Sequence, residues 1–100
     1  MKYFSLLALL VLLFIHTVHA QTWNGSASNV WSNPLNWTPN TVPGTGSAVS
    51  IPGSLGTYPL LSANVTIASL TMAAGAVLNT NGKTITVNGA LDINQATMSG

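Results

Sequence analysis

The segments "VTIASLTM" (residues 65–72) and "ITVNGALDI" (residues 85–93) decide the fold expected of this 100-residue chain. In both, apolar residues alternate with Thr, Asp or small residues, so that pairs of apolar side chains fall on one face of an extended strand. Gly75, Asn81-Gly82 and Asn88-Gly89 separate the strands and permit the positive φ of tight turns. No stretch after Gln21 has a helical apolar period. The pattern predicts an all-β fold of short strands.

The two segments also repeat each other, because apolar pairs recur 20 or 21 residues later. A repeat of about 20 residues built from short strands is typical of a β-solenoid, whose coils stack in parallel about 4.8 Å apart. We therefore expect residues 63–100 to form the first coils of a right-handed parallel β-solenoid (β-helix) that is incomplete. The matched pairs are Val65 and Ile67 with Ile85 and Val87, Leu70 and Met72 with Leu91 and Ile93, and Ala76 and Leu78 with Ala96 and Met98.

The alternative fold is an antiparallel β-meander. Asn81-Gly82 between alternating strands is the strongest short hairpin signal, and a hairpin there would pair Leu78 with Ile85. Two observations favour the solenoid. Three apolar pairs recur at nearly one spacing, and the linkers between strands are too short for hairpins throughout.

The N-terminus has the three parts of a secretory signal. A basic residue precedes an apolar run from Tyr3 to Ile15, and the small residues Val18 and Ala20 follow at positions −3 and −1. The run is too short to span a hydrocarbon core of roughly 30 Å as a helix. We expect residues 1–20 to be a signal peptide, cleaved so that the mature chain begins at Gln21, whose side chain can cyclise to pyroglutamate. The protein is then secreted or displayed at the cell surface through the general secretory pathway.

Little chemistry remains after the leader. Lys83 and Asp92 are the only charged side chains from Gln21 onward, and histidine and cysteine are absent there. General acid–base pairs need two titratable groups, and metal sites need several ligands. We expect no catalytic residue, metal or cofactor in this segment, and no nucleic-acid binding because the side chains are neutral overall. Asp92 aligns with Thr71 on the outward face and Lys83 follows a turn, so both are expected in solvent.

Residues 21–62 predict an irregular N-terminal cap with an entry strand at Ala48–Ile51. All five prolines and all three tryptophans of the chain lie in this part, and proline is excluded from central strands. We expect Trp23, Trp31 and Trp37 to cover the open end of the first coil, with each indole N–H bound to a loop carbonyl. The alternative is a stacking platform that binds a surface polysaccharide or host glycan. The usual burial of large apolar side chains favours the cap.

The residues also carry a family resemblance. "TWNG…VWSNPLNWTPNTVPGTGSAVSIP" followed by "VTIASLTMAAGAVLNTNGKTITVNGALDI" resembles the N-terminal region of large secreted bacterial surface proteins. Those are adhesin-like or autotransporter-like proteins with parallel β-helix passengers, or proteins with a C-terminal sorting domain. The pattern W-x-G, then N-W, then V-P-G-x-G-x-x-V-x-I is similar to the start of a G8-type β-helical domain.

The resemblance implies an exported cell-surface or extracellular protein, structural or adhesin-like, without catalytic chemistry in this segment. The alternative is the N-terminal part of a β-helical carbohydrate-active enzyme with its active site beyond residue 100. Neither reading identifies a ligand or a partner, and neither predicts a membrane span in the mature chain.

Overall fold

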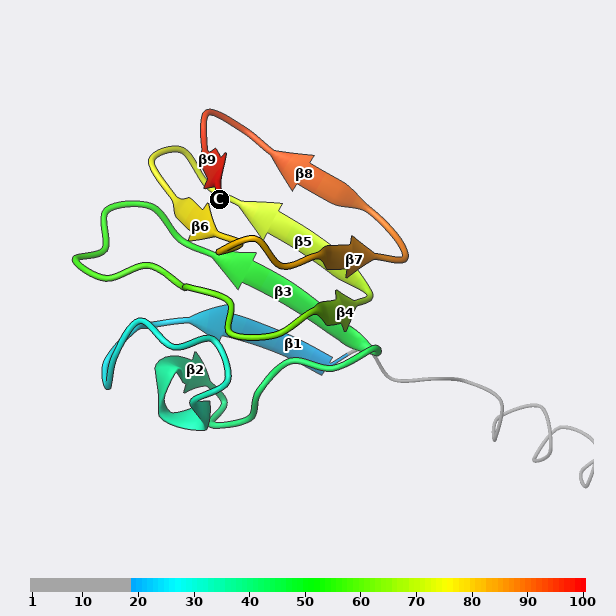
Figure 1. Ribbon diagram of the computed structural model, residues 1–100, viewed down its shortest axis with the longest axis horizontal. Coiled ribbons are helices and arrows are strands. Elements are labelled where there is room, and N and C mark those ends of the chain that lie inside the picture. The colour runs from blue at the N-terminus through cyan, green and yellow to red at the C-terminus, as the bar shows by residue number, and fades with distance from the viewer. Residues whose placement is uncertain (1–18) are drawn as a thin grey trace, which may run out of the picture.

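The computed structural model describes residues 19–100, so the expected leader, apart from its last two residues, lies outside the described residues. The fold is all-β, with one short 3₁₀ turn, η1, at Pro34–Asn36. The strands are β1 (His19–Trp23), β2 (Trp37–Thr38), β3 (Ser47–Ile51), β4 (Val65–Ile67), β5 (Ser69–Met72), β6 (Val77–Asn79), β7 (Ile85–Val87), β8 (Leu91–Ile93) and β9 (Thr97–Ser99) (Figure 1).

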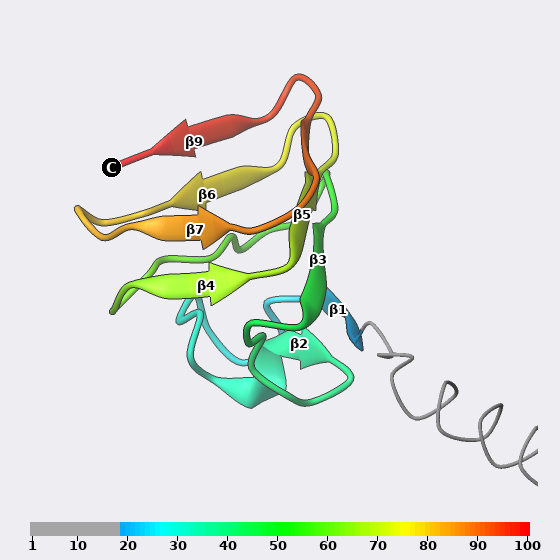
Figure 2. The same cartoon turned by 90° about the vertical axis from the view of Figure 1, so that its right-hand side faces the viewer.

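The strands form one larger sheet and two small ones. The larger sheet has the order β2-β1-β3-β5-β8, in which β1, β3, β5 and β8 are parallel and β2 is antiparallel to β1. The two small sheets are the parallel pairs β4-β7 and β6-β9. Figure 2 shows these two pairs lying to one side of the wall that contains β1, β3 and β5. From β4 to β6 the chain contributes one strand to each of the three sheets, and from β7 to β9 it contributes a second strand to each, in the same order.

We call β4–β6 (residues 65–79) the first circuit and β7–β9 (residues 85–99) the second circuit. Each strand of the second circuit pairs in parallel with its counterpart in the first, and the register is the one that the sequence repeat predicts. Leu70 lies opposite Leu91, and Leu78 lies opposite Met98. Ile85 pairs with Val65 rather than with Leu78, so the hairpin of the meander alternative is not formed.

A corner with a left-handed residue follows each of the strands β3, β5 and β8. Ser54, Gly75 and Gln95 have φ values of 60°, 84° and 56° and come shortly after β3, β5 and β8. The Gly75 N–H donates to the Gln95 carbonyl at 3.1 Å, so the last two corners lie against each other. Only one of the three is glycine, the residue that adopts this conformation without steric cost. The recurrence of a left-handed residue at these corners could therefore not be recognised from the residue types in the sequence.

The N-terminal part is more regular than its sequence predicts. The expected strand at 48–51 is present as β3, but β1 was not expected, and it places Gln21 opposite Val49. A polar residue in a column of apolar ones breaks the alternation that identifies a strand. Since β1 and β3 belong to the same sheet as β5 and β8, the core runs continuously across the expected boundary between residues 62 and 63.

Burial falls steeply from the first circuit to the second. In the first circuit Leu70, Met72 and Leu78 are at most 1% exposed. Their counterparts have no layer of described residues beyond them, and their side chains are 57%, 38% and 41% exposed, for Leu91, Ile93 and Met98 respectively. The apolar core thus continues to the surface at the β8 end of the molecule.

The three tryptophans form a buried cluster at the opposite end, beside β2. Trp37 packs edge to face against both Trp23 and Trp31, with ring centroids 5.2 and 4.8 Å apart. The indole of Trp23 donates to the Thr57 carbonyl and that of Trp37 to the Trp31 carbonyl, both at 2.8 Å. The expectation was wrong for Trp31, whose buried indole N–H has no hydrogen-bond partner among the described residues. Each side chain is at most 1% exposed. A sugar platform requires exposed ring faces, which these rings do not present.

Trp37→Ala should lower the free energy of unfolding by about 3–5 kcal/mol, the usual cost of deleting a large buried aromatic side chain. The loss is a large fraction of the stability of a small domain. Chemical denaturation of the chain from Gln21 measures it, and acrylamide quenching of the wild type should show shielded indoles.

Leu35→Ala and Asp92→Asn are the matched controls, because Leu35 is 56% exposed and Asp92 lies in solvent. Both should unfold at nearly the wild-type denaturant concentration. An unchanged midpoint for Trp37→Ala, with freely quenched emission from folded protein, would contradict the burial of the cluster.

Candidate functional site

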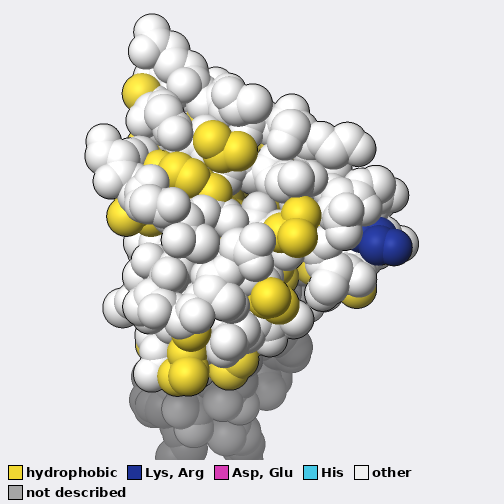
Figure 3. All heavy atoms as spheres, turned by 60° about the vertical axis from the view of Figure 1, so that its left-hand side comes forward, with side chains coloured by type: hydrophobic (Ala, Val, Ile, Leu, Met, Phe, Trp, Pro, Cys, Tyr) yellow, Lys and Arg dark blue, Asp and Glu magenta, His cyan; other side chains and the backbone are white. Residues whose placement is uncertain are grey.

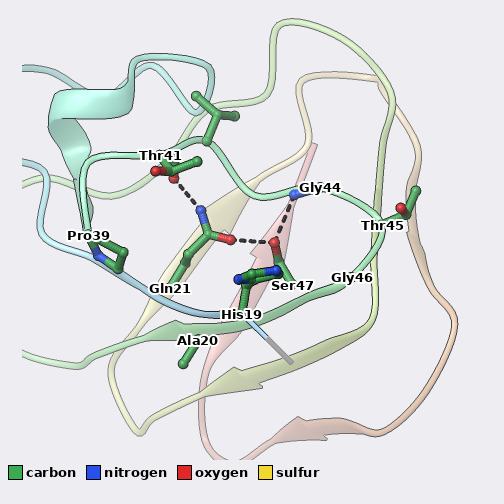
Figure 4. Close-up of a pocket in the computed structure, with 10 residues that line it drawn as sticks. His19, Ala20, Gln21, Pro39, Thr41, Gly44, Thr45, Gly46 and Ser47 are labelled. Carbon is green, nitrogen blue, oxygen red and sulfur yellow. Dashed lines mark hydrogen bonds between the residues drawn. The ribbon is translucent and has the colours of Figure 1, made fainter. Parts of the chain in front are cut away.

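An open cavity of about 550 Å³ lies where β1 and β3 begin. Its walls are the first residues of these two strands and the loop from Pro39 to Gly46 (Figure 4). The lining combines apolar residues such as Pro39 and Val42 with polar ones such as Gln21 and Ser47, and it contains no Lys, Arg, Asp or Glu. It is the hollow that we consider as a candidate site.

A chain of hydrogen bonds closes the floor of this cavity. The Gln21 side-chain amide donates from Nε2 to the Thr41 carbonyl and accepts at Oε1 from the Ser47 hydroxyl. Ser47 Oγ in turn accepts from the Gly44 N–H at 2.9 Å (Figure 4). Gln21 and Ser47 are only 3% and 5% exposed. The hydroxyl of Ser47 is used as both donor and acceptor, so it holds the loop against β1 and β3.

The expected processing site lies in the same place. Ala20 pairs with Ala48, and Gln21 pairs with Val49, so the bond between Ala20 and Gln21 is inside β1. The side chain of Ala20 is exposed and that of Gln21 is buried. Cleavage there would remove His19 and Ala20 from the strand and leave Gln21, with its buried amide, as the first residue of β1.

The two charged residues expected in solvent are both exposed. Asp92 lies opposite Thr71 on the outward face of β8, as the sequence alignment predicts. Lys83 lies at the turn before β7, where its N–H donates to the Thr80 carbonyl at 2.8 Å. Figure 3 shows a face on which one basic side chain stands out among uncharged ones.

Within residues 19–100, no three His, Cys, Asp or Glu side chains are grouped as a metal site would need. The same residues contain no helix long and apolar enough to cross a membrane.

Asn36 is a structural centre that the sequence did not reveal. Its side chain is fully buried, and Oδ1 accepts from the Ala27 and Ser28 N–H groups at 2.9 and 2.8 Å. Nδ2 donates to the Ser28 hydroxyl and to the Val30 carbonyl, at 3.0 and 2.9 Å. One amide thus organises the whole loop between β1 and Trp31. The only local signal is its position in η1, directly before Trp37.

Asn36→Asp should destabilise the domain by about 3 kcal/mol or more. The substitution keeps the acceptor for two N–H groups but removes both donors and buries a charge beside the Val30 carbonyl. Thermal unfolding measures the loss. Asn40→Asp is the matched control, since Asn40 is exposed, and it should leave the melting temperature within a degree or so of the wild type. Equal melting temperatures for the two variants would show that Asn36 does not hold the loop.

The comparisons with known proteins place the chain in a family. No curated protein and no solved structure matches the chain. A family model described as a domain of unknown function, DUF8693, matches residues 22–99. The match begins within β1 and ends within β9, so it includes the tryptophan cluster and both circuits. The chain belongs to this family, DUF8693.

Proposed function

We propose that this chain is the N-terminal part of an exported cell-surface or extracellular protein whose body is a right-handed parallel β-solenoid. In this proposal the segment is structural or adhesin-like and carries no catalytic chemistry of its own. The observation that carries it is the set of three parallel strand pairs between the first and second circuits, whose partners are 20 or 21 residues apart.

The packing of the circuits supports a solenoid. Apolar side chains at matched positions lie above one another, as Leu70 and Leu91 do, and β1 and β3 extend the same column in the other direction. The left-handed corners after β3, β5 and β8 recur at the same place in the path. Stacking of equivalent side chains and equivalent corners is what coils of one repeat produce.

The two ends of the stack of strands differ. At one end β2 pairs with the edge of β1, and the tryptophan cluster fills the interior. At the other end β7, β8 and β9 each have one edge without a strand partner among residues 19–100. Solenoids need atypical capping units at their ends, and an uncapped end accepts further coils. We therefore propose that the layer of Leu91, Ile93 and Met98 is an assembly surface.

Export is proposed from the leader and from the surface. The exposed side chains of the described residues are mainly Asn, Ser, Thr and Gly, with Lys83 and Asp92 as the only Lys, Arg, Asp or Glu side chains. Such a surface carries no strong field, so a proposed glycan or matrix partner would be bound by hydrogen bonds and contact area rather than by charge.

Processing of the leader is tested by changing the residue before the expected cleavage. In an exporting bacterial host, Ala20→Arg should block cleavage because the −1 position requires a small side chain. Ala20→Ser should be processed like the wild type, and intact mass should then give Gln21 as the first residue. Ala20 is exposed in β1, so neither change disturbs the core. Wild-type protein recovered outside the cytoplasm with Met1 retained would overturn the proposed processing.

The assembly surface is tested by sedimentation of the chain from Gln21. We expect self-association that rises with concentration, because unpaired strand edges and exposed apolar side chains associate. Ile93→Lys should abolish it by placing a charge in the exposed layer. Thr71→Lys is the matched control, because Thr71 is exposed on the outward face of β5, away from that layer.

A folded chain that stays monomeric at all concentrations would contradict the assembly surface.

The sequence downstream of residue 100 distinguishes between the structural or adhesin-like protein and the carbohydrate-active enzyme. Repeated uncharged coils followed by a sorting or barrel domain support the structural reading. A cluster of Asp, His, Lys or Arg on one outward strand face would instead support the alternative, a carbohydrate-active enzyme.

A further inference from the structure

We infer that the folded domain keeps its N-terminal Gln21 as glutamine and prevents its cyclisation to pyroglutamate. The inference rests on the proposed cleavage after Ala20. In cyclisation the α-amino nitrogen of Gln21 attacks its own Cδ, a new N–Cδ bond forms, the Cδ–Nε2 bond breaks, and Nε2 leaves as ammonia. An N-terminal glutamine in a flexible tail can undergo this reaction. The geometry of β1 opposes it.

Both polar atoms of the Gln21 side chain are already bound. Nε2 donates to the Thr41 carbonyl and Oε1 accepts from the Ser47 hydroxyl, so the amide is fixed at both atoms. The side chain is 3% exposed, and in Figure 4 it points toward Thr41 and Ser47 on the floor of the cavity. To react, it would have to leave these partners and fold back on its own backbone nitrogen.

The backbone restricts the other reacting atom. Gln21 and Thr22 lie opposite Val49 and Ser50 in the parallel ladder between β1 and β3, and this pairing remains after His19 and Ala20 are removed. The amino group is therefore held at the start of a paired strand. A reaction that needs both groups to move requires β1 to detach from β3 first.

The product would also fit the site poorly. The lactam has no NH₂ group, so the Thr41 carbonyl would lose its donor. The ring keeps the Cδ carbonyl oxygen but carries it back toward the backbone nitrogen, away from the Ser47 hydroxyl that binds it in the folded chain. Buried polar groups that lose their partners destabilise the folded state. The folded domain thus disfavours both the path to pyroglutamate and the product, and cyclisation is confined to chains that have not folded.

The experiment compares native and unfolded protein of the full processed chain. Exported wild-type protein is treated with an enzyme that cyclises N-terminal glutamine, in buffer and in urea at a concentration that unfolds the chain but not the enzyme. The loss of ammonia is followed by mass spectrometry of the N-terminal peptide. We expect purified native protein to retain Gln21 and to react at least roughly tenfold more slowly than unfolded protein. Equal rates would overturn the inference.

Two variants locate the protection. Ser47→Ala removes the hydroxyl that holds Oε1 and should raise the native rate roughly tenfold, toward the unfolded rate. Ser50→Ala, on the exposed face of the same strand, should react like the wild type. If circular dichroism shows that Ser47→Ala is unfolded, the inference is tested on the wild type alone. Its cyclisation rate across a urea series should follow the unfolded fraction. A cyclisation rate that does not change with that fraction contradicts the inference.

Failure of the proposed function gives a different result. If exported material begins at a residue other than Gln21, the processing proposal fails. The protection of Gln21 is then measured on a chain released at Gln21 by a site-specific protease. Rapid cyclisation of that native chain would overturn the inference independently of how the protein is exported.

Discussion

The fold depends on the register of parallel backbone pairing between the first and second circuits. A slip of one residue in any of these strand pairs would turn the apolar side chains from the core to the surface, because side chains alternate along a strand. The register survives an unequal repeat: Leu70 pairs with a residue 21 positions later, while Ile67 and Leu78 pair with residues 20 positions later. The extra residue is taken up between β7 and β8. There Asn88 N–H donates to the Ile67 carbonyl at 3.0 Å, and a Cβ on Gly89 would lie 2.6 Å from the Ala68 carbonyl oxygen. Only glycine permits so close an approach of the two circuits at this corner.

The strand pairing of the two circuits was predictable because the sequence pattern that indicates it is local and repeated. Alternation of apolar residues identifies each strand, and the recurrence of apolar pairs identifies its partner, so the register followed without any knowledge of three-dimensional contacts.

Strand β1 was not predictable in the same way. Its inward residues are Gln21 and Trp23, and the partners that make a buried glutamine acceptable, Thr41 and Ser47, are 20 and 26 residues away. The role of Asn36 was hidden for the same reason, since a buried asparagine is recognised only from the groups that it binds. For the candidate site, the burial of the tryptophans was predicted from the sequence and is confirmed, and the cleavage between Ala20 and Gln21 stays a prediction. The cavity that brings Gln21 and Ser47 together was not predicted.

Asparagine side chains cross-link loops and strands in this chain, a role that ion pairs and disulfides have in other small domains. The amide has both a donor and an acceptor, so it can substitute for a missing backbone partner at a loop or corner. Asn36 satisfies four groups in the first loop, and Asn64 accepts from the Thr84 N–H at 2.9 Å between successive turns of the chain. Asn81 donates from its side chain to the Leu61 carbonyl at 3.2 Å. Part of the richness in asparagine is therefore explained by bonds inside the structure. Such bonds do not depend on pH or redox state, which would suit the export that we propose.

The asymmetry between the two ends implies an order of assembly. The tryptophan cluster, β2 and the Asn36 loop are formed by residues near the N-terminus, and they offer β1 and β3 as a template. Strands β5, β7, β8 and β9 each add to an edge laid down about 20 residues earlier, so each of these steps closes a short loop at modest entropic cost. Among the strand pairs, β1 and β3 close the longest loop, between residues such as Gln21 and Val49. The buried rings and the amide of Gln21 supply contacts that offset its cost. We therefore expect the cap to form first and the circuits to add in sequence from it. The burial of Gln21 between β1, β3 and the loop that contains Thr41 is then among the earliest events of folding.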